Sequence, residues 1–128
     1  MQLPLIYVAH PYGGNVENLG RAELWLERLS QWAPALFWAP WIQLCRLWPD
    51  ANETRERGLE IDRQCVAMSD GMLMFGRSVS VGMLREKRAA RSVLDMTSLV
   101  DMDRLLQSQD WCNDLLAWID TLTKGSDQ

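Results

Sequence analysis

Short apolar runs alternate with longer amphipathic segments along this chain, and this alternation restricts the possible folds more than any other feature. Four short runs are largely apolar: 3–9, 35–39, 71–75 and 92–96. Strands that are apolar throughout are buried on both faces, as in parallel sheets that carry helices on each side. We therefore expect an α/β protein with a small doubly wound parallel sheet of four to five strands.

The segments between these runs have the spacing of amphipathic helices. We expect helices over 15–32, 54–68 and 80–91, and over most of the chain beyond 96. Residues 42–48 fit either a short helix or a packed loop, and 123–128 are expected to form a frayed polar tail. The chain has no repeat or linker, so residues 1–128 are expected to form one flavodoxin-like domain.

The charge of the chain argues against a polymeric or membrane partner. The formal net charge is −4, and the arginine-rich stretch 85–91 is short enough to be one solvated helix face. Proteins that bind nucleic acid polymers normally carry a basic stripe, whereas a small anionic ligand needs only local positive potential. We find neither a secretory signal pattern nor an apolar run long enough to span a bilayer. We therefore expect a cytoplasmic protein without membrane contact.

The sequence contains few residues of the types that bind metal ions or form disulfides. Cys45, Cys65 and Cys112 are odd in number and widely spaced, so they predict free thiols in a reducing compartment rather than a zinc site or disulfides. His10 is the one histidine of the chain, which excludes a multi-histidine metal site. No phosphate-binding P-loop, dinucleotide fingerprint or nucleophile elbow is present. No metal or cofactor is therefore expected.

Two loops occupy the positions where open parallel sheets bind ligands, beyond the carboxyl ends of their strands. They are 10–15 and 77–82. In the second loop Ser80 begins a helix and Gly82 allows close backbone approach, which favours a phosphate or carboxylate ligand. Serine is also a common helix N-cap without any ligand, so the structural interpretation of Ser80 stays open.

Three further residues are candidates for chemistry. Asp62 lies at the border of the apolar face of its expected helix, where a carboxylate is either paired, used, or turned toward water. Glu86 lies one to two turns beyond Ser80, and it either points back to the strand ends or forms a solvated ion pair. Tyr7 lies within an apolar strand, where a buried hydroxyl needs a partner.

These residues together resemble a known superfamily, the nucleoside 2-deoxyribosyltransferases. Residues 6–12, Ile-Tyr-Val-Ala-His-Pro-Tyr, resemble its first strand and loop. Asp62, the run 69–76 and the run 80–86, Ser-Val-Gly-Met-Leu-Arg-Glu, resemble its core in order and spacing. The likeness covers most of residues 3–96 and is greatest to the branch of the 2′-deoxynucleoside 5′-monophosphate N-glycosidases and related uncharacterised, often phage-encoded proteins.

The resemblance implies a role for each matched residue. Glu86 matches the nucleophile that attacks C1′ of the sugar, Asp62 the acid that protonates the departing base, and Tyr7 the tyrosine that orients the nucleophile. Ser80 matches a serine that contacts the 5′-phosphate, where deoxyribosyltransferases usually carry an aspartate, and this favours a nucleotide over a free nucleoside. The expected substrate-binding residues are Ser80, Gly82, His10, Pro11 and Gly13.

The implied chemistry is consistent with two carboxylates in different protonation states. An N-glycosidic bond breaks through an oxocarbenium-like transition state, which one carboxylate stabilises while another group protonates the leaving base. The protein environment must therefore give the two carboxyl groups different pKa values. We expect Glu86, exposed among cations, to stay ionised, and Asp62, against apolar neighbours, to hold its proton longer.

The chain also departs from the family pattern. His10 stands where the family usually has a small residue, and the 10–15 loop lacks the arginine of phosphate-binding relatives, a role for which Arg55 and Arg77 are candidates. The alternative function is therefore a catalytically inactive module that binds or senses a nucleotide.

A third hypothesis is an interaction protein with a contact surface formed by Trp38, Trp41 and Trp48. Because the sites of the family are completed across a subunit boundary, the resemblance also implies a homodimer or higher homo-oligomer. The partners expected overall are a small nucleoside or nucleotide and further copies of this chain.

Overall fold

The sheet has four parallel strands. The computed structural model describes residues 2–12, 15–48, 52–76, 79–97 and 110–126. The strands are β1 (Leu5–Ala9), β2 (Leu36–Trp38), β3 (Gly71–Met74) and β4 (Val93–Asp95), in the order β2-β1-β3-β4. All three pairings are parallel. The predicted α/β class and the number of strands are therefore confirmed.

Helices fill the connections between the strands, and a further helix, α6, follows β4. They are α1 (Val16–Trp32), α2 (Pro40–Leu47), α3 (Asn52–Met68), α4 (Val81–Ala89) and α6 (Asp110–Ser126). The ambiguous segment 42–48 belongs largely to a helix, which Pro40 begins at a position where proline's missing N–H costs nothing. The helix α6 extends to Ser126, so the part of the expected frayed tail from 123 to 126 is helical.

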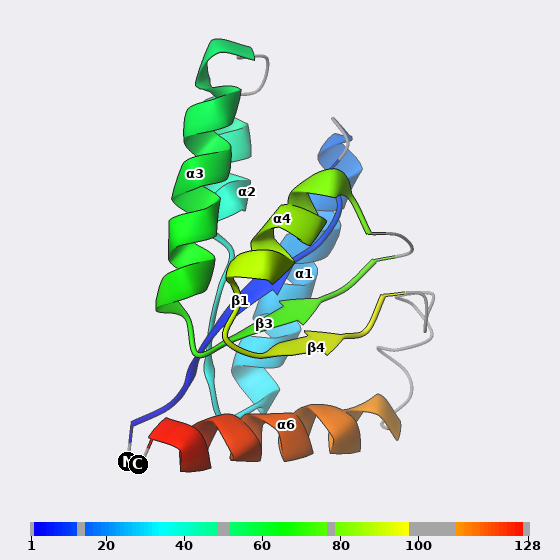
Figure 1. Ribbon diagram of the computed structural model, residues 1–128. Helices are drawn as coiled ribbons and strands as arrows, with labels where there is room; N and C mark the ends of the chain where they lie inside the picture. The colour runs from blue at the N-terminus through cyan, green and yellow to red at the C-terminus, as the bar shows by residue number, and fades with distance from the viewer. Residues whose placement is uncertain (1, 13–14, 49–51, 77–78, 98–109, 127–128) are drawn as a thin grey trace.

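The helices cover both faces of the sheet, as a doubly wound fold requires. Figure 1 shows α1 behind the sheet and α4 in front of it. Trp25 of α1 stacks on Phe75, just beyond β3, with ring centroids 4.0 Å apart. Trp118 of α6 contacts the backbone of Gly71, which shares the face of Phe75 because side chains alternate along a strand. Hence α1 and α6 cover one face, and α3 and α4 the other.

The central strands form the core, and tryptophans tie the surrounding helices to it. Every residue of β3 and four of the five residues of β1 are buried. The Trp41 indole N–H donates to the carbonyl oxygen of Val8 at 2.8 Å, and that of Trp38 donates to Ser69 Oγ at 2.9 Å. Trp41 is buried, Trp38 packs against the core and Trp48 is half-buried. The predicted tryptophan contact surface is therefore wrong for Trp41, whereas for the half-buried Trp38 and Trp48 it stays a prediction.

The carboxyl ends of the four strands meet at one edge of the sheet, because all of them are parallel. The helices α1, α2 and α4 each begin beyond this edge. The edge therefore gathers side chains from segments that are far apart in the sequence, as open α/β sheets do at their ligand sites. Within the described part of the chain, no helix is both long enough and apolar enough to cross a membrane.

Candidate active site

Three polar side chains from three different elements converge on the α3–α4 face of the sheet. They are Tyr7 of β1, Asp62 of α3 and Glu86 of α4, with exposed fractions of 0%, 7% and 8%. Burial raises the pKa of Tyr7, and the charges of Glu86 and Asp62 raise it further. Burial also raises the pKa of Glu86, and the charge of Asp62 adds to that increase. The structure thus brings together the three residues that the resemblance assigns to catalysis.

Each carboxylate occupies a position within the buried stripe of its helix. Asp62 lies one turn before Val66, which is fully buried, and Glu86 lies one turn after Met83, which is also buried. Residues three or four positions apart face the same side of a helix, so the packing of Val66 and Met83 directs both carboxylates inward. An apolar residue at either position would fit the amphipathic pattern better.

The polar atoms of this cluster lack hydrogen-bond partners. Tyr7 Oη, Asp62 Oδ1 and Glu86 Oε2 are shielded from solvent, and no described residue forms a hydrogen bond with any of them. Leaving a buried polar group unpaired costs on the order of 1–3 kcal/mol, more if it is charged. Native proteins avoid such groups except where function requires them. We therefore take this cluster as the candidate active site.

Burial changes the acid–base properties of both carboxyl groups. It raises the pKa of Glu86 to about 8, with a further increase from the Asp62 charge and an opposing decrease from the nearby Tyr7 hydroxyl. It also raises the pKa of Asp62 to about 7. Near neutral pH the two groups therefore titrate as one coupled pair.

The expectation that Glu86 is exposed among cations is therefore wrong. Arg85, Lys87 and Arg88 are exposed on α4, whereas Glu86 is buried on the opposite side of the helix. Consecutive residues of a helix point in different directions, so residues that are neighbours in the sequence can have different environments. The protonation of Glu86 is governed by burial and by Asp62 rather than by the adjacent arginines.

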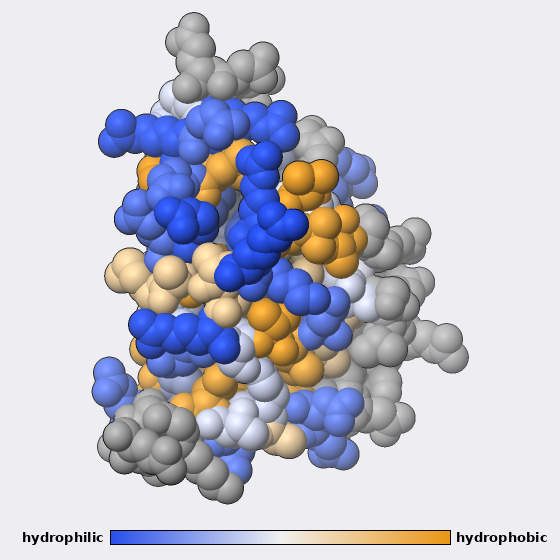
Figure 2. All heavy atoms as spheres, in the orientation of Figure 1, coloured by the Kyte–Doolittle hydropathy of each residue, from blue (hydrophilic) through white to orange (hydrophobic). Residues whose placement is uncertain are grey.

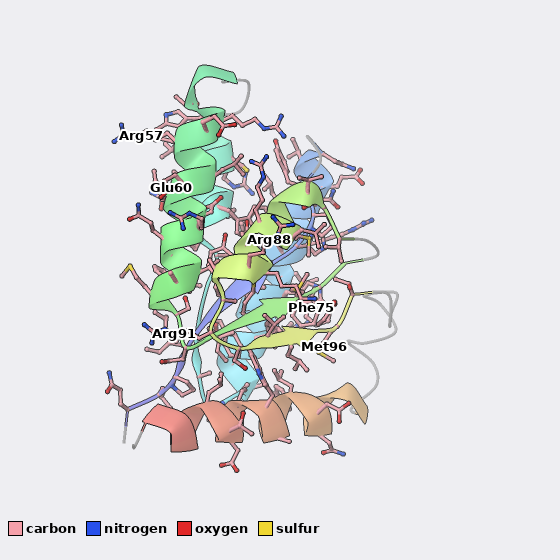
Figure 3. All side chains as sticks on the ribbon, viewed as in Figure 1. Arg57, Glu60, Phe75, Arg88, Arg91 and Met96 are labelled. Atoms are coloured by element: carbon pink, nitrogen blue, oxygen red, sulfur yellow. The ribbon has the colours of Figure 1, made fainter. Side chains whose placement is uncertain are left out.

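A cavity of about 150 Å³ between α3 and α4 reaches the cluster at Glu86. Figure 2 shows hydrophilic side chains gathered over this part of the surface, and Figure 3 marks Glu60 on α3 and Arg88 on α4. The cavity is lined by Glu56, Leu59, Glu60, Arg63, Gly82, Arg85 and Glu86. Asp62 and Tyr7 are not among the lining residues, so this cavity meets the cluster at Glu86 alone.

Ser80 and Gly82 lie at the start of α4. Ser80 Oγ accepts a hydrogen bond from the Met83 backbone N–H at 3.2 Å, so this serine serves as the N-cap of the helix. A Cβ atom on Gly82 would lie 3.8 Å from Ser80 Oγ and 3.9 Å from Leu59 Cδ2, an ordinary packing distance. Packing within the chain therefore does not require glycine at position 82.

His10 and Pro11 follow β1 at the same edge of the sheet. His10 is 7% exposed, and its Nδ1 lies 2.9 Å from the Pro11 carbonyl oxygen. Burial lowers the His10 pKa, the hydrogen bond with the Pro11 carbonyl oxygen opposes this decrease, and the charge of Arg21 on α1 adds to it. Pro11 packs on Gly76, whose φ of +111° suits glycine and where a Cβ atom would approach Pro11 Cδ to 2.5 Å.

The other predicted ligand contacts are exposed or not described. Gly13 and Arg77 lie outside the described residues, and Arg55 is exposed on α3. Among the described residues, no cluster of three histidine, cysteine, aspartate or glutamate side chains is arranged to hold a metal ion.

The sequence analysis missed Cys45 of α2 as a neighbour of the site. Burial and then the charges of Asp62 and Glu86 raise the pKa of the Cys45 thiol to about 11. Cys45 lies one helical turn after the buried Trp41. That spacing is a signal for a side chain turned toward the core, and it could have indicated this position.

The fold and the buried carboxylates define a small doubly wound α/β protein with an acidic site between its sheet and the helices α3 and α4. The chain belongs to a family described as a domain of unknown function (DUF7768), whose sequence model matches residues 4–97. This range contains Tyr7, Asp62 and Glu86 and ends before α6. Comparisons with curated proteins and with solved structures gave no match.

Proposed function

We propose that this protein cleaves or transfers the N-glycosidic bond of a (deoxy)nucleoside or its 5′-monophosphate. The observation that carries the proposal is the convergence of Tyr7, Asp62 and Glu86, which are buried together and lack hydrogen-bond partners. The resemblance to the nucleoside 2-deoxyribosyltransferases assigns a catalytic role to the same three residues. Sequence and geometry therefore support the proposal from separate directions.

In the proposed first step Glu86 is the nucleophile. One of its carboxylate oxygens bonds to C1′ as the bond from C1′ to the base nitrogen breaks, and Asp62 donates its proton to the departing base. In the second step water or another base attacks C1′, Glu86 leaves, and Asp62 takes up the proton of the attacking group. Without substrate the pKa of Glu86, about 8, is higher than that of Asp62, about 7, which is the reverse of the expected order. The proposed mechanism therefore requires substrate binding to ionise Glu86 while Asp62 keeps its proton.

Tyr7 is the positioning residue of this mechanism. Its hydroxyl lies near enough to Glu86 to lower the carboxyl pKa, although the two form no well-aligned hydrogen bond. A small shift of either side chain makes this bond, and in catalytic sites such bonds often tighten only when substrate is bound. Tyr7 then holds one oxygen of Glu86 while the other faces C1′.

The substrate in this proposal is a small molecule held at the carboxyl edge of the sheet. The backbone N–H groups of the first turn of α4, together with Ser80 and Gly82, suit a 5′-phosphate. A cytoplasmic location fits both this substrate and the free thiols of Cys45 and Cys65.

Release of free base from 2′-deoxynucleoside 5′-monophosphates and from the matching nucleosides tests the proposal. The wild-type protein should release base, and Glu86→Gln should lower the rate by on the order of 10²–10⁴-fold. Glu27→Gln is the matched control, because it removes an exposed glutamate of α1 on the opposite face of the sheet. If wild type and Glu86→Gln both release no base from any of these compounds, the enzymatic proposal is rejected.

The same experiment distinguishes the alternative, a nucleotide-binding or sensing module without catalysis. A nucleotide that raises the melting temperature but is never cleaved favours that alternative. Thermal-shift screening with the same compounds therefore accompanies the assay.

We further propose that the protein forms a homodimer or a higher homo-oligomer. The resemblance implies a site completed by a second subunit, and α4 exposes apolar side chains next to the cavity, with Val81 68% and Leu84 48% exposed. Exposed apolar surface of this kind often marks an interface. Light scattering after size exclusion should show an oligomer for wild type and a monomer for Leu84→Lys, and a monomeric wild type would contradict the proposal.

A further inference from the structure

When its carboxyl groups ionise, the active-site cluster carries negative charge, and no described residue supplies a compensating cation. The groups that face it are Tyr7 from β1, Cys45 from α2, Asp62 and Cys65 from α3, and Glu86 from α4. None of these groups carries a positive charge in any protonation state. Buried carboxylates are otherwise paired with cations or coordinate metals. Among the described residues, the cluster therefore lacks the partner that its burial calls for.

The arginines that line the cavity do not supply this partner. Arg63 forms an ion pair with Glu60 on the same helix, and both side chains are about half exposed. Arg85 lines the cavity but is exposed. Burial raises the pKa of Asp62, and burial, the Asp62 charge and the Tyr7 hydroxyl act on the pKa of Glu86, so neither arginine is a cause of these shifts. Among the described residues no side chain supplies positive charge to the cluster, so a cationic ligand would balance its ionised form.

The unpartnered oxygens specify the rest of the ligand. Asp62 Oδ1 and Glu86 Oε2 accept hydrogen bonds when ionised, and Tyr7 Oη both donates and accepts. A ligand that satisfies all three must therefore bring donors together with its charge. The cavity of about 150 Å³ has room for a small ring rather than for a polymer.

We propose that the Tyr7–Asp62–Glu86 cluster binds small hydroxylated cations, of the class of protonated pyrrolidine diols, in preference to neutral rings of the same shape. This inference rests on the proposed function, since a cluster that stabilises positive charge on a sugar ring also binds a ring that already carries that charge. The ammonium group lies between the two carboxylates, and its N–H groups donate to them. The ring hydroxyls bond to Tyr7 and to the cavity wall.

Binding of such a cation is coupled to release of protons. Without ligand the two carboxyls retain protons to near neutral pH. A bound cation favours their ionised forms, so protons leave as the ligand enters. Affinity should then rise with pH by up to about tenfold per pH unit for each proton released, until the amine itself loses its charge.

Isothermal titration calorimetry with 2-(hydroxymethyl)pyrrolidin-3-ol tests this inference on the full chain, with the corresponding tetrahydrofuran as the neutral isostere. The pyrrolidine should bind at least about tenfold more tightly than the ether at about pH 8, and its affinity should rise from about pH 6 upward. Titrations in two buffers of different ionisation enthalpy should show the released protons.

Variants identify the groups that hold the cation. Glu86→Gln and Asp62→Asn should each weaken pyrrolidine binding by at least about tenfold and flatten its pH dependence, whereas Glu27→Gln should change neither. Equal affinity for pyrrolidine and ether, affinity independent of pH, or unchanged binding by the folded Glu86→Gln protein would each overturn the inference. Circular dichroism confirms that each variant is folded.

The result of the pyrrolidine binding experiment can be distinguished from the result of the base-release assay that tests the proposed function. Base release without preference for the pyrrolidine keeps the glycosidase proposal and removes the cation site. Selective, pH-linked pyrrolidine binding without base release from any nucleoside or nucleotide keeps the cation site and rejects the glycosidase.

Discussion

Asp62 and Glu86 hold positions in their helices where an apolar side chain would pack without cost. Both are more than nine-tenths buried, and each leaves one oxygen without a hydrogen-bond partner. Burial of a carboxylate is unfavourable unless a proton, a cation or hydrogen bonds compensate it. In this protein the compensation comes from protonation, which is why both pKa values are raised.

The raised pKa values predict how stability depends on pH. The folded protein binds protons up to about pH 7 at Asp62 and about pH 8 at Glu86, whereas the unfolded chain releases them near pH 4. The contribution of these groups to stability is therefore fully present below about pH 4 and is lost as pH rises through about 7 and 8.

Urea denaturation at several pH values measures this dependence. The free energy of unfolding of the wild type should fall between about pH 5 and pH 8. In Asp62→Asn and in Glu86→Gln this fall should be smaller by on the order of 2 kcal/mol. Glu27→Gln should keep the wild-type profile, because Glu27 is exposed. A wild-type free energy of unfolding that increases over this range contradicts the prediction.

The Tyr7 hydroxyl offers a test that separates stability from activity. It is fully buried and unpartnered, so Tyr7→Phe removes a polar atom that contributes no hydrogen bond to the fold. We expect a free energy of unfolding within about 1 kcal/mol of wild type and a kcat for base release lower by about 10- to 100-fold. A large loss of stability with unchanged kcat contradicts the positioning role.

At the scale of elements, α6 packs on the sheet through an unusually close contact. A Cβ atom added to Gly71 of β3 would lie 2.6 Å from Trp118 Cζ2 and 2.9 Å from Leu122 Cδ1. Trp118 is further fixed by a hydrogen bond from its indole N–H to Ser92 Oγ at 2.9 Å. The absence of a side chain at position 71 therefore sets how closely α6 approaches β3.

Alanine substitutions at two glycines measure this packing. Gly71→Ala should destabilise the protein by about 1–3 kcal/mol, because the indole ring of Trp118 must move away. Gly20→Ala in α1 is the matched control, since its Cβ atom meets nothing within 4 Å and should stabilise the helix by about 0.5–1 kcal/mol. Equal effects of the two substitutions in thermal or urea denaturation would show that α6 does not restrict position 71.

At the scale of the whole molecule, the family match and the folded unit have different boundaries. The match ends at residue 97, whereas α6 adds Leu115, Ile119 and Leu122 to the buried core. Burial of each such side chain stabilises a fold by roughly 1.5–3 kcal/mol, and a domain is stable by only about 5–15 kcal/mol in total. The matched region therefore lacks an essential layer of this fold.

Truncation tests this conclusion. A chain that ends at residue 97 should lose most of its cooperative unfolding transition and expose the face that includes Gly71. Adding residues 98–128 back as a separate chain should restore the transition in part. A truncated protein with wild-type stability would show that α6 is dispensable.

The amino-acid sequence by itself determined the architecture. Alternation of apolar runs with amphipathic segments is a local property, so it predicted the parallel sheet, the main helices and the loops at the carboxyl edge. It left 42–48 undecided because a short apolar segment fits more than one structure. It also placed Ser80 at a helix start, where the serine caps α4.

The tertiary structure decided what surrounds each carboxylate. The sequence places Glu86 beside three cations, yet the turn of α4 directs it inward to Asp62 and Tyr7, and only the packing of α3 against α4 buries the pair. Burial and the distance between groups that are remote in sequence fix a pKa, and neither follows from local pattern. The same holds for Cys45, whose nearness to the site depends on how α2 packs against α3.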